Sequence, residues 1–294
     1  MRDSTLSSFV STGGDALAMR DWPLPAGWPT RGVVLLVHGL GEHIGRYDHV
    51  AARLNDWGFA VRGYDQVGHG ASIGARGGLP AEDRLLSDLA AVIDDTRVRM
   101  DDRLPLILLG HSMGGLVAAR LVSLKLRRVE GLVLSSPALD VGMAAPLRAL
   151  VQLLAGVAPG LRLGNGIDPR LLSHDPQVVQ AYQNDPLVHD RISARLARFI
   201  VTAGSAVVQY APRWKVPTLL LYAGQDRAVR PAGSAAFARA APPALVTAQE
   251  FPAHYHELFN ELDSAPVFEA LRAWLTAQFA PAAPVAPAQV EQPA

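Results

Sequence analysis

Residues 106–126 read LILLGHSMGGLVAARLVSLKL and contain the most specific pattern in the chain. The apolar run at 106–109 predicts a strand and residues 116–126 predict a helix, with Gly110-His111-Ser112-Met113-Gly114 between them as a G-x-S-x-G pattern. A serine on such a sharp strand-to-helix turn has strained backbone geometry, and glycines flank it because side chains there would clash. Ser112 is therefore predicted to be a nucleophile at this turn, with an inert turn as the alternative.

The rest of the chain alternates between predicted strands and predicted helices. The strands of the expected parallel sheet are residues 33–37, 60–64, 106–109, 131–134, 218–222 and 244–251. Most of these are continuous apolar runs, as in strands covered on both faces. Amphipathic patterns at 47–57, 85–96 and 268–279 predict helices. Because residues 6–10 and 16–22 also predict an antiparallel hairpin, we expect an α/β fold with an eight-stranded, mostly parallel sheet and helices on both faces.

Residues 139–212 interrupt this alternation, since no convincing strand occurs between the fourth and fifth parallel strands. We expect residues 1–138 and 213–279 to form the core, 139–212 to be a helical cap or lid insertion, and 280–294 to be a disordered Pro/Ala-rich tail. Residues 139–163 contain only Asp140, Arg148 and Arg162 as charges. This part is either a cap packed on the core or a lid whose apolar face lines an acyl pocket or contacts a membrane or lipid aggregate.

Composition excludes several classes of protein. The chain has 27 Lys and Arg against 27 Asp and Glu, and this zero net charge disfavours a nucleic-acid partner. The absence of Cys from the sequence excludes disulfides, Cys-ligated zinc, iron–sulfur clusters and thiol nucleophiles. Because residues 1–10 lack the apolar core of a secretory leader and no run reaches about 18 apolar residues, we expect a cytoplasmic protein with at most peripheral membrane contact.

A nucleophilic serine needs a base, and the base needs an acid that fixes its tautomer. On a strand-turn-helix nucleophile of this kind the chain order is Ser, then Asp or Glu, then His, and the later two follow the carboxyl ends of strands. Asp226 follows the predicted strand at 218–222 and is the favoured acid. Asp140, which comes after the preceding strand, is the alternative.

The base is expected after the last strand, where residues 251–258 read FPAHYHEL. His256 is favoured because a helical pattern at 257–261 follows it directly, and His254 is the alternative. A His-x-His pair can also bind a metal, but no third ligand with suitable spacing is evident, so no metal site is expected.

The oxyanion of the intermediate needs two N–H donors. One is predicted to be the N–H of Met113, directly after the nucleophile, and the other the N–H of Leu40, in the glycine-containing loop at 38–43. This loop lacks both the phosphate-binding G-x-x-x-x-G-K-[ST] pattern and the dinucleotide fingerprint, so no phosphate or nicotinamide cofactor is expected. His38 is predicted to anchor the loop by hydrogen bonds.

These motifs resemble the monoacylglycerol lipases of the α/β-hydrolase superfamily, within its lysophospholipase and serine aminopeptidase-like group. The resemblance covers nearly the whole chain. It rests on HGLGEH at 38–43 with GRY at 45–47, DQVGHG at 65–70, GHSMGG at 110–115, and the insertion segments GID at 166–168 and YQNDPL at 182–187. The two insertion segments are the more specific, because the other motifs recur across many hydrolases.

The resemblance implies an α/β-hydrolase fold and a triad of Ser112, Asp226 and His256. It also implies an oxyanion hole at Leu40 and Met113, and a substrate-binding region with Glu42 and Arg46 toward the glycerol end of the pocket and Tyr182 from the insertion. Mammalian members have a second His three residues after the catalytic one, and Phe259 stands there in this chain.

We expect a serine ester hydrolase that cleaves a single-chain lipid ester, with monoacylglycerol the favoured substrate and no cofactor. The alternatives are a short- to medium-chain carboxylesterase, a lysophospholipase, an aminopeptidase and a non-catalytic scaffold. The catalytic residues do not separate the enzymes among these, because they act on the carbonyl rather than on the leaving group.

Overall fold

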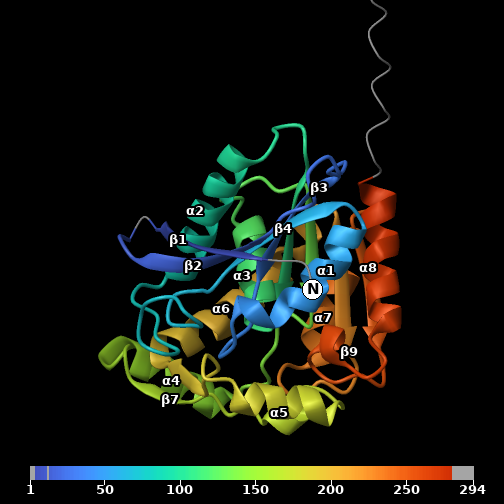
Figure 1. Cartoon of the computed structure of the whole chain (residues 1–294). Coiled ribbons are helices and arrows are strands. Elements are labelled where there is room, and N and C mark those ends of the chain that lie inside the picture. The colour runs from blue at the N-terminus through green and yellow to red at the C-terminus, as the bar shows by residue number, and fades with distance from the viewer. Residues whose placement is uncertain (1–3, 12, 280–294) are drawn as a thin grey trace, which may run out of the picture.

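The computed structural model describes residues 4–11 and 13–279, so the predicted tail at 280–294 lies outside the described residues (Figure 1). An eight-stranded sheet has the order β1-β2-β4-β3-β5-β6-β9-β10. Its strands are β1 Thr5–Val10, β2 Ala16–Trp22, β3 Gly32–Val37, β4 Phe59–Tyr64, β5 Leu106–His111, β6 Gly131–Ser135, β9 Thr218–Ala223 and β10 Val246–Phe251. The pairs β1/β2 and β2/β4 are antiparallel and the others are parallel, which confirms the predicted mostly parallel sheet.

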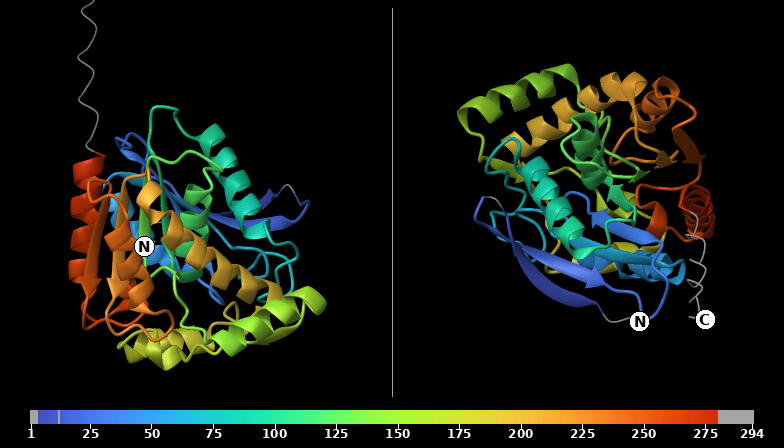
Figure 2. Two further views of the ribbon diagram at one scale, coloured as in Figure 1. Left: turned by 180° about the vertical axis from the view of Figure 1, so that it is seen from behind. Right: turned by 90° about the horizontal axis from the view of Figure 1, so that it is seen from above.

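Alternate residues of the central strands point to two separate hydrophobic cores. On β3, Val34 and Leu36 pack in the core with α1 (Asp48–Asp56) and α8 (Ala265–Gln278). Leu35 and Val37 pack in the other core, with α2 (Arg84–Arg99), α3 (Ser112–Ser123) and α7 (Pro231–Ala240). The period-two alternation of a strand therefore explains why apolar runs without polar positions fit here. The two groups of helices lie on opposite sides of the sheet (Figure 2).

The segment between β6 and β9 contains α4 (Ala145–Val157), α5 (Pro176–Asn184) and α6 (Ala194–Tyr210), with 3₁₀ turns at Pro169–Leu171 and Ala211–Arg213. It also contains a two-stranded antiparallel ladder of β7 (Arg162–Gly164) and β8 (Arg191–Ser193), so the expectation of no strand here was wrong. Each of these strands has only three residues, too short to form a pattern in the sequence. Helices α4 and α5 and strand β7 lie across one end of the sheet (Figure 1), and α6 packs on core helix α3.

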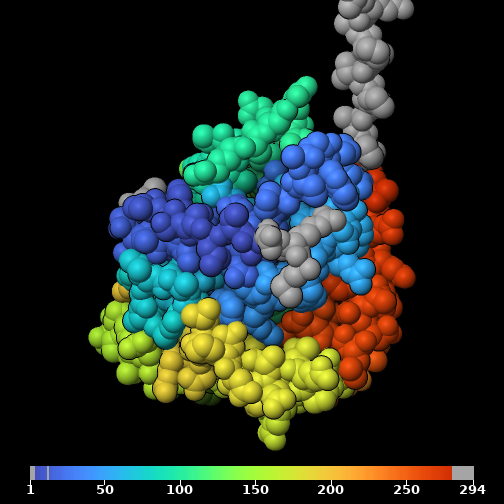
Figure 3. All heavy atoms as spheres, in the orientation of Figure 1, coloured from blue at the N-terminus to red at the C-terminus, as the bar shows by residue number. Residues whose placement is uncertain are grey.

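The insertion is attached to two loops of the core. It lies beside the loop at 65–82 (Figure 3), where the carbonyl oxygen of Gly77 accepts a hydrogen bond from the N–H of Ser193 at 2.8 Å. It also contacts the loop after β3, where the N–H of His189 donates to the carbonyl oxygen of Gly41 at 2.8 Å. Gly41 has a φ of 79°, and a Cβ there would collide with the His189 carbonyl oxygen. Glycine at this position therefore allows the close approach.

Two predicted helices have different ends in the structure. Helix α3 begins at Ser112 rather than at residue 116, because the turn leads directly into the first helical residue. The helical pattern at 257–261 forms only a 3₁₀ turn, Leu258–Asn260, and the last α-helix begins at Ala265 with a proline in its first turn.

Candidate active site

Ser112 lies at the turn between β5 and α3, with a φ of 52° in the left-handed region that non-glycine residues rarely adopt. The flanking glycines make this turn possible. A Cβ on Gly110 would lie 2.6 Å from the carbonyl oxygen of Gly114, and a Cβ on Gly114 would collide with the carbonyl oxygen of Val37. The strained position places Ser112 at the amino end of α3, where developing negative charge is favoured.

The structure brings His256 and Asp226 together. Nδ1 of His256 lies 2.6 Å from Oδ2 of Asp226, and Oδ1 of Asp226 accepts from the N–H groups of Ala228 and Val229, both at 2.9 Å. Burial raises the pKa of Asp226, but the charge and hydrogen bond of His256 lower it by more, so this carboxyl is ionised. An ionised Asp226 fixes the proton of His256 on Nδ1 and directs Nε2 away from the acid.

Ser112 and His256 line the same small cavity, together with Leu40 of the loop after β3 and Tyr182 of α5. Ser112, His256 and Asp226 thus come from three separate segments at the carboxyl ends of β5, β10 and β9. Such a meeting of strand ends is where open parallel sheets place their ligands.

The two alternative residues have other partners. Oδ1 of Asp140 accepts from the N–H of Gly142 at 2.8 Å, and Nε2 of His254 lies 2.8 Å from the carbonyl oxygen of Asp263. Within the described part of the chain, no hydrogen bond joins Asp140 to a histidine or His254 to an acid side chain.

The loop after β3 carries Leu40, one of the two predicted oxyanion donors, and Met113 lies at the start of α3. His38 holds the base of this loop: the N–H of Gln66 donates to its Nε2 at 2.9 Å, and the Gln66 amide donates to its carbonyl oxygen at 2.7 Å. Gly39 packs directly against Ser112, since a Cβ on Gly39 would lie 3.2 Å from the Ser112 Cβ. The loop backbone therefore reaches the nucleophile.

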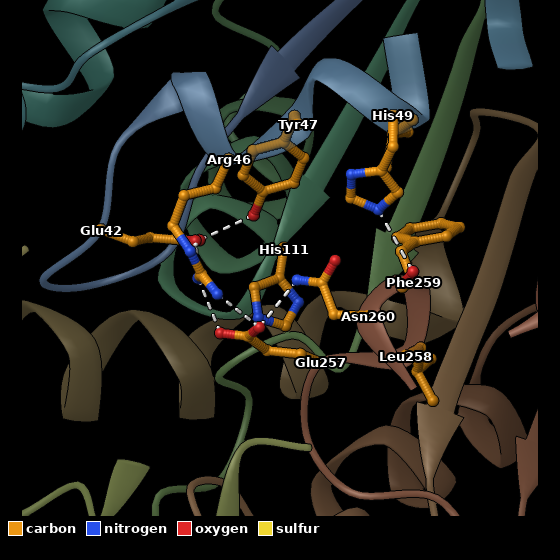
Figure 4. Close-up of a pocket in the computed structure, with 10 residues that line it drawn as sticks. Glu42, Arg46, Tyr47, His49, His111, Glu257, Leu258, Phe259 and Asn260 are labelled. Carbon is orange, nitrogen blue, oxygen red and sulfur yellow. Dashed lines mark hydrogen bonds and ion pairs between the residues drawn. The ribbon is translucent and has the colours of Figure 1, made fainter. Parts of the chain in front are cut away.

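Glu42 is buried and the Arg46 side chain is 11% exposed, and both lie in a polar cluster with Tyr47 and Glu257 (Figure 4). Oε1 of Glu42 accepts from the hydroxyl of Tyr47 at 2.7 Å and from the N–H of Gly39 at 2.5 Å. Arg46 binds Glu42 at 2.6 Å and Glu257 at 2.7 Å. Their predicted contact with a substrate alcohol stays a prediction, since every polar atom named here already has a protein partner.

Sequence reasoning missed Glu257, the residue directly after His256. Its carboxylate binds both terminal nitrogens of Arg46 and accepts from the side chain of Asn260 at 2.7 Å. An acidic residue directly after the predicted base was the available signal. Tyr182 faces the same cluster, because the guanidinium carbon of Arg46 lies 4.8 Å from its ring centroid.

A larger cavity of about 550 Å³ begins at Ser112, Met113 and Leu40 and extends under the insertion. Its polar lining residues are few and include Asn165 and Arg227. Its apolar lining comes from Ala138, Val141, Met143, Ala144, Leu147, Ile167, Leu171, Ile192, Ala197, Ile200, Val201, Ala228 and Val229. Such a lining suits an apolar ligand that ends in a carbonyl group at Ser112.

Residues 4–11 and 13–279 contain no group of three or more His, Cys, Asp or Glu placed to hold a metal ion. Over the same residues, no helix has the length and apolar character needed to cross a membrane.

Known proteins similar to this chain include monoacylglycerol lipases. A family model described as serine aminopeptidase, S33, matches residues 29–263. A monoacylglycerol lipase from Mycolicibacterium smegmatis is 35% identical over 277 residues, which cover 91% of this chain and 95% of that protein. An uncharacterized abhydrolase domain-containing protein from Dictyostelium discoideum is 30% identical over 92% of this chain, which spans only 29% of that longer protein.

Solved structures show the same likeness. The crystal structure of a monoacylglycerol lipase from Paleococcus ferrophilus has a TM-score of 0.80 and 35% identity, and the match covers 89% of this chain and 99% of that one.

Proposed function

We propose that this chain, which belongs to the serine aminopeptidase S33 family, hydrolyses monoacylglycerols. Ser112, His256 and Asp226 are its proposed catalytic triad. The chain has the α/β-hydrolase fold, and its lipase relatives make it a carboxylic ester hydrolase that acts on lipid esters. The choice of monoacylglycerol, the residue roles and the function of the insertion are the proposed part.

The observation that carries the substrate proposal is the difference between the two cavities that meet at Ser112. The cavity under the insertion has about 550 Å³ and is mainly apolar, whereas the one toward His256 and Glu42 has only about 20 Å³. A site needs roughly 10–15 Å³ of such volume to hold one water molecule. One long acyl chain therefore fits in the large cavity, whereas the small cavity has room for about one water molecule and excludes a second acyl chain, which favours a single-chain ester.

The proposed reaction has two steps, the acylation of Ser112 and the hydrolysis of the acyl-enzyme. The oxygen of Ser112 attacks the ester carbonyl while Nε2 of His256 takes the serine proton, and the N–H groups of Leu40 and Met113 bind the oxyanion. His256 returns the proton to the departing glycerol oxygen, which leaves an acyl-enzyme. A water molecule then attacks the acyl group and gives one proton to His256, which passes it to the Ser112 oxygen as the acyl–oxygen bond breaks and the fatty acid leaves. Asp226 orients the imidazole throughout.

We further propose that residues 139–212 form a cap between the core parts 1–138 and 213–279, and that its helix α4 contacts lipid aggregates. Leu147, Leu150 and Leu153 of α4 are each about half exposed or more, at 50%, 48% and 61%. Arg148 is the single charged residue in this helix. An exposed apolar face of this kind favours contact with the aggregated substrate that must enter the cavity beneath it.

The test compares one enzyme preparation on four substrate classes: p-nitrophenyl esters of graded chain length, monoacylglycerols, a lysophospholipid and a prolyl amide. Each CH₂ group buried contributes about 0.8 kcal/mol, close to fourfold in kcat/KM, so kcat/KM should rise with chain length until the cavity is full. Monoacylglycerol should be the preferred natural substrate. A maximum at acetate or butyrate would indicate a short-chain esterase instead, and preference for the lysophospholipid or the amide would overturn the head-group proposal.

A further inference from the structure

Two buried carboxylates share one guanidinium behind the candidate triad. Arg46 donates to Glu42 through one terminal nitrogen at 2.6 Å and to both carboxylate oxygens of Glu257 at 2.7 Å. The side chains are almost fully buried, with 5% exposure for Glu42, 11% for Arg46 and 5% for Glu257. The three side chains converge in Figure 4, with Tyr47 and Asn260 donating from either side. We refer to these three residues as the Glu42–Arg46–Glu257 cluster.

The cluster joins two loops that the proposed reaction needs in fixed positions. Glu42 belongs to the loop after β3 and accepts from the N–H of Gly39, one residue before the oxyanion donor Leu40. Glu257 directly follows the base His256. Arg46 therefore links the loop after β3, which carries Leu40, to the loop that carries His256. Arg46 and Glu257 are 211 residues apart in the sequence.

Stability does not explain this arrangement. Transferring three charged groups out of water costs several kcal/mol for each ion, and apolar side chains of similar volume are often as stable or more stable in such places. The cluster nevertheless has its polar atoms paired, which fixes its geometry closely. A costly but rigid group beside a nucleophile and its base indicates a role in the reaction.

We propose that Arg46 and Glu257 are positioning residues, which hold the oxyanion loop against the histidine loop and leave one uncompensated negative charge beside His256. This inference rests on the proposed triad but not on the identity of the lipid. Neither residue needs to contact substrate for this role.

The charge balance supports the second part. Burial raises the pKa of Glu42, but Arg46, His111, His38 and the hydrogen bond from Tyr47 together lower it to about 2. For Glu257 burial likewise raises the pKa and Arg46 lowers it below its usual value, while Arg46 itself is held more firmly protonated. At neutral pH the cluster therefore carries two negative charges and one positive charge.

His256 is surrounded by charged and titratable groups from five parts of the chain. Burial lowers its pKa, while Asp226 of the loop after β9, then Glu257 and then Glu42 raise it, so that the net pKa lies above its usual value. The ring of His111, at the end of β5, lies 4.6 Å away, but burial and His256 lower its pKa to about 4, so it is neutral at working pH. Burial raises the pKa of Tyr182 on α5, which is also neutral. Removal of the Glu257 charge should therefore lower the pKa of His256.

The first experiment is Glu257→Gln, assayed with p-nitrophenyl butyrate across pH, because this activated ester reports on the triad without a long acyl chain. We expect kcat to fall about tenfold or more, since small displacements of reacting groups are costly, and the acid limb of kcat/KM to shift to lower pH. Glu261→Gln is the matched control, because Glu261 is a buried glutamate on the same loop. It binds Tyr255 and His174 instead of Arg46, so its acid limb should stay in place.

A double variant, Arg46→Met with Glu257→Gln, separates position from charge. It removes one charge of each sign and leaves Glu42 with its Gly39 and Tyr47 partners, so the net charge of the cluster is unchanged. We expect its acid limb to return toward that of the wild type while kcat remains low. If Glu257→Gln does not fold, the kcat of the double variant still tests the positioning role. An unmoved acid limb in Glu257→Gln, or a wild-type kcat in the double variant, overturns the inference.

Failure of the proposed function would look different. If the wild-type protein hydrolyses p-nitrophenyl butyrate but not monoacylglycerol, the substrate proposal is wrong and the test of Arg46 and Glu257 is unaffected. If the wild-type protein hydrolyses no ester at all, the triad proposal fails first.

Discussion

The two sides of Ser112 are built from opposite kinds of side chain. Behind it, Glu42, Arg46 and Glu257 are charged and almost fully buried. In front, Leu150 and Leu153 of α4 are apolar and about half exposed or more. Both arrangements reverse the ordinary distribution, in which charged groups are exposed and large apolar groups are buried. The buried side depends on hydrogen-bond geometry, whereas the exposed side depends only on apolar area.

This difference gives a way to tell the two sides apart by experiment. A change on the buried side should reduce turnover of every ester by a similar factor, because all substrates share the reacting carbonyl. A change on α4 should affect long-chain esters more than short ones, because only long chains gain from apolar contact there.

The largest effect is expected for Ser112→Ala, with kcat reduced by roughly 10⁴ to 10⁶ on all chain lengths, as is typical for loss of a triad nucleophile. A fluorophosphonate probe should label Ser112 in the wild type and nothing in the variant. If peptide mapping finds the label on a different serine, Ser112 is not the nucleophile, and the comparison of the two sides of Ser112 no longer applies.

Asp226→Asn should be next, with a loss of roughly 10⁴ in kcat, because the amide favours the wrong tautomer of His256 while the fold is retained. Asp140→Asn is the matched control, since the hydrogen bond described for the Asp140 carboxylate comes from the N–H of Gly142 in its own loop. His256→Ala and His254→Ala form a second pair in the same assay. Severe loss in the Asp140 or His254 variant, with near-normal rates in its counterpart, would show that the acid or the base is misassigned.

The pH dependence of kcat/KM should show a smaller effect, a shift of its acid limb to higher pH. Burial lowers the pKa of His256, but Asp226, Glu257 and Glu42 together raise it by more, so the net pKa lies above the usual 6.5. His256 must be neutral to act as a base, so kcat/KM should fall as the pH drops through this raised pKa, with the midpoint of its acid limb above 6.5. A midpoint below 6.5 would mean that burial outweighs the carboxylates around His256.

The smallest effect is expected on the exposed side. Leu150→Asp should reduce kcat/KM for long-chain esters by about tenfold, roughly the effect of losing part of a buried leucine contact, and should spare butyrate esters. Leu124→Asp is the control, because Leu124 is similarly exposed, 42% against 48%, and lies just after the far end of α3. Equal loss on all chain lengths would show that Leu150 only holds the cap together.

Sequence patterns were sufficient where a single segment carries the physical signal. The strands of the large sheet were located to within about two residues, because continuous apolar runs are required wherever both faces are covered. The turn at Ser112 was also evident, since its glycines and its flanking strand and helix are contiguous in the chain. The short ladder of β7 and β8 was missed, because three-residue strands with mostly exposed side chains leave no hydrophobic pattern.

The folded chain was needed wherever the signal depends on the direction of distant side chains. Whether Asp226 or Asp140 faces the base is set by where the loop after β9 places its carboxylate, 30 residues from His256. The contact of Arg46 with Glu257 joins positions 211 residues apart, and neither residue has a local pattern that requires the other. Backbone periodicity is a property of neighbouring residues and can be read locally, whereas the pairing of buried charges follows from close packing in three dimensions.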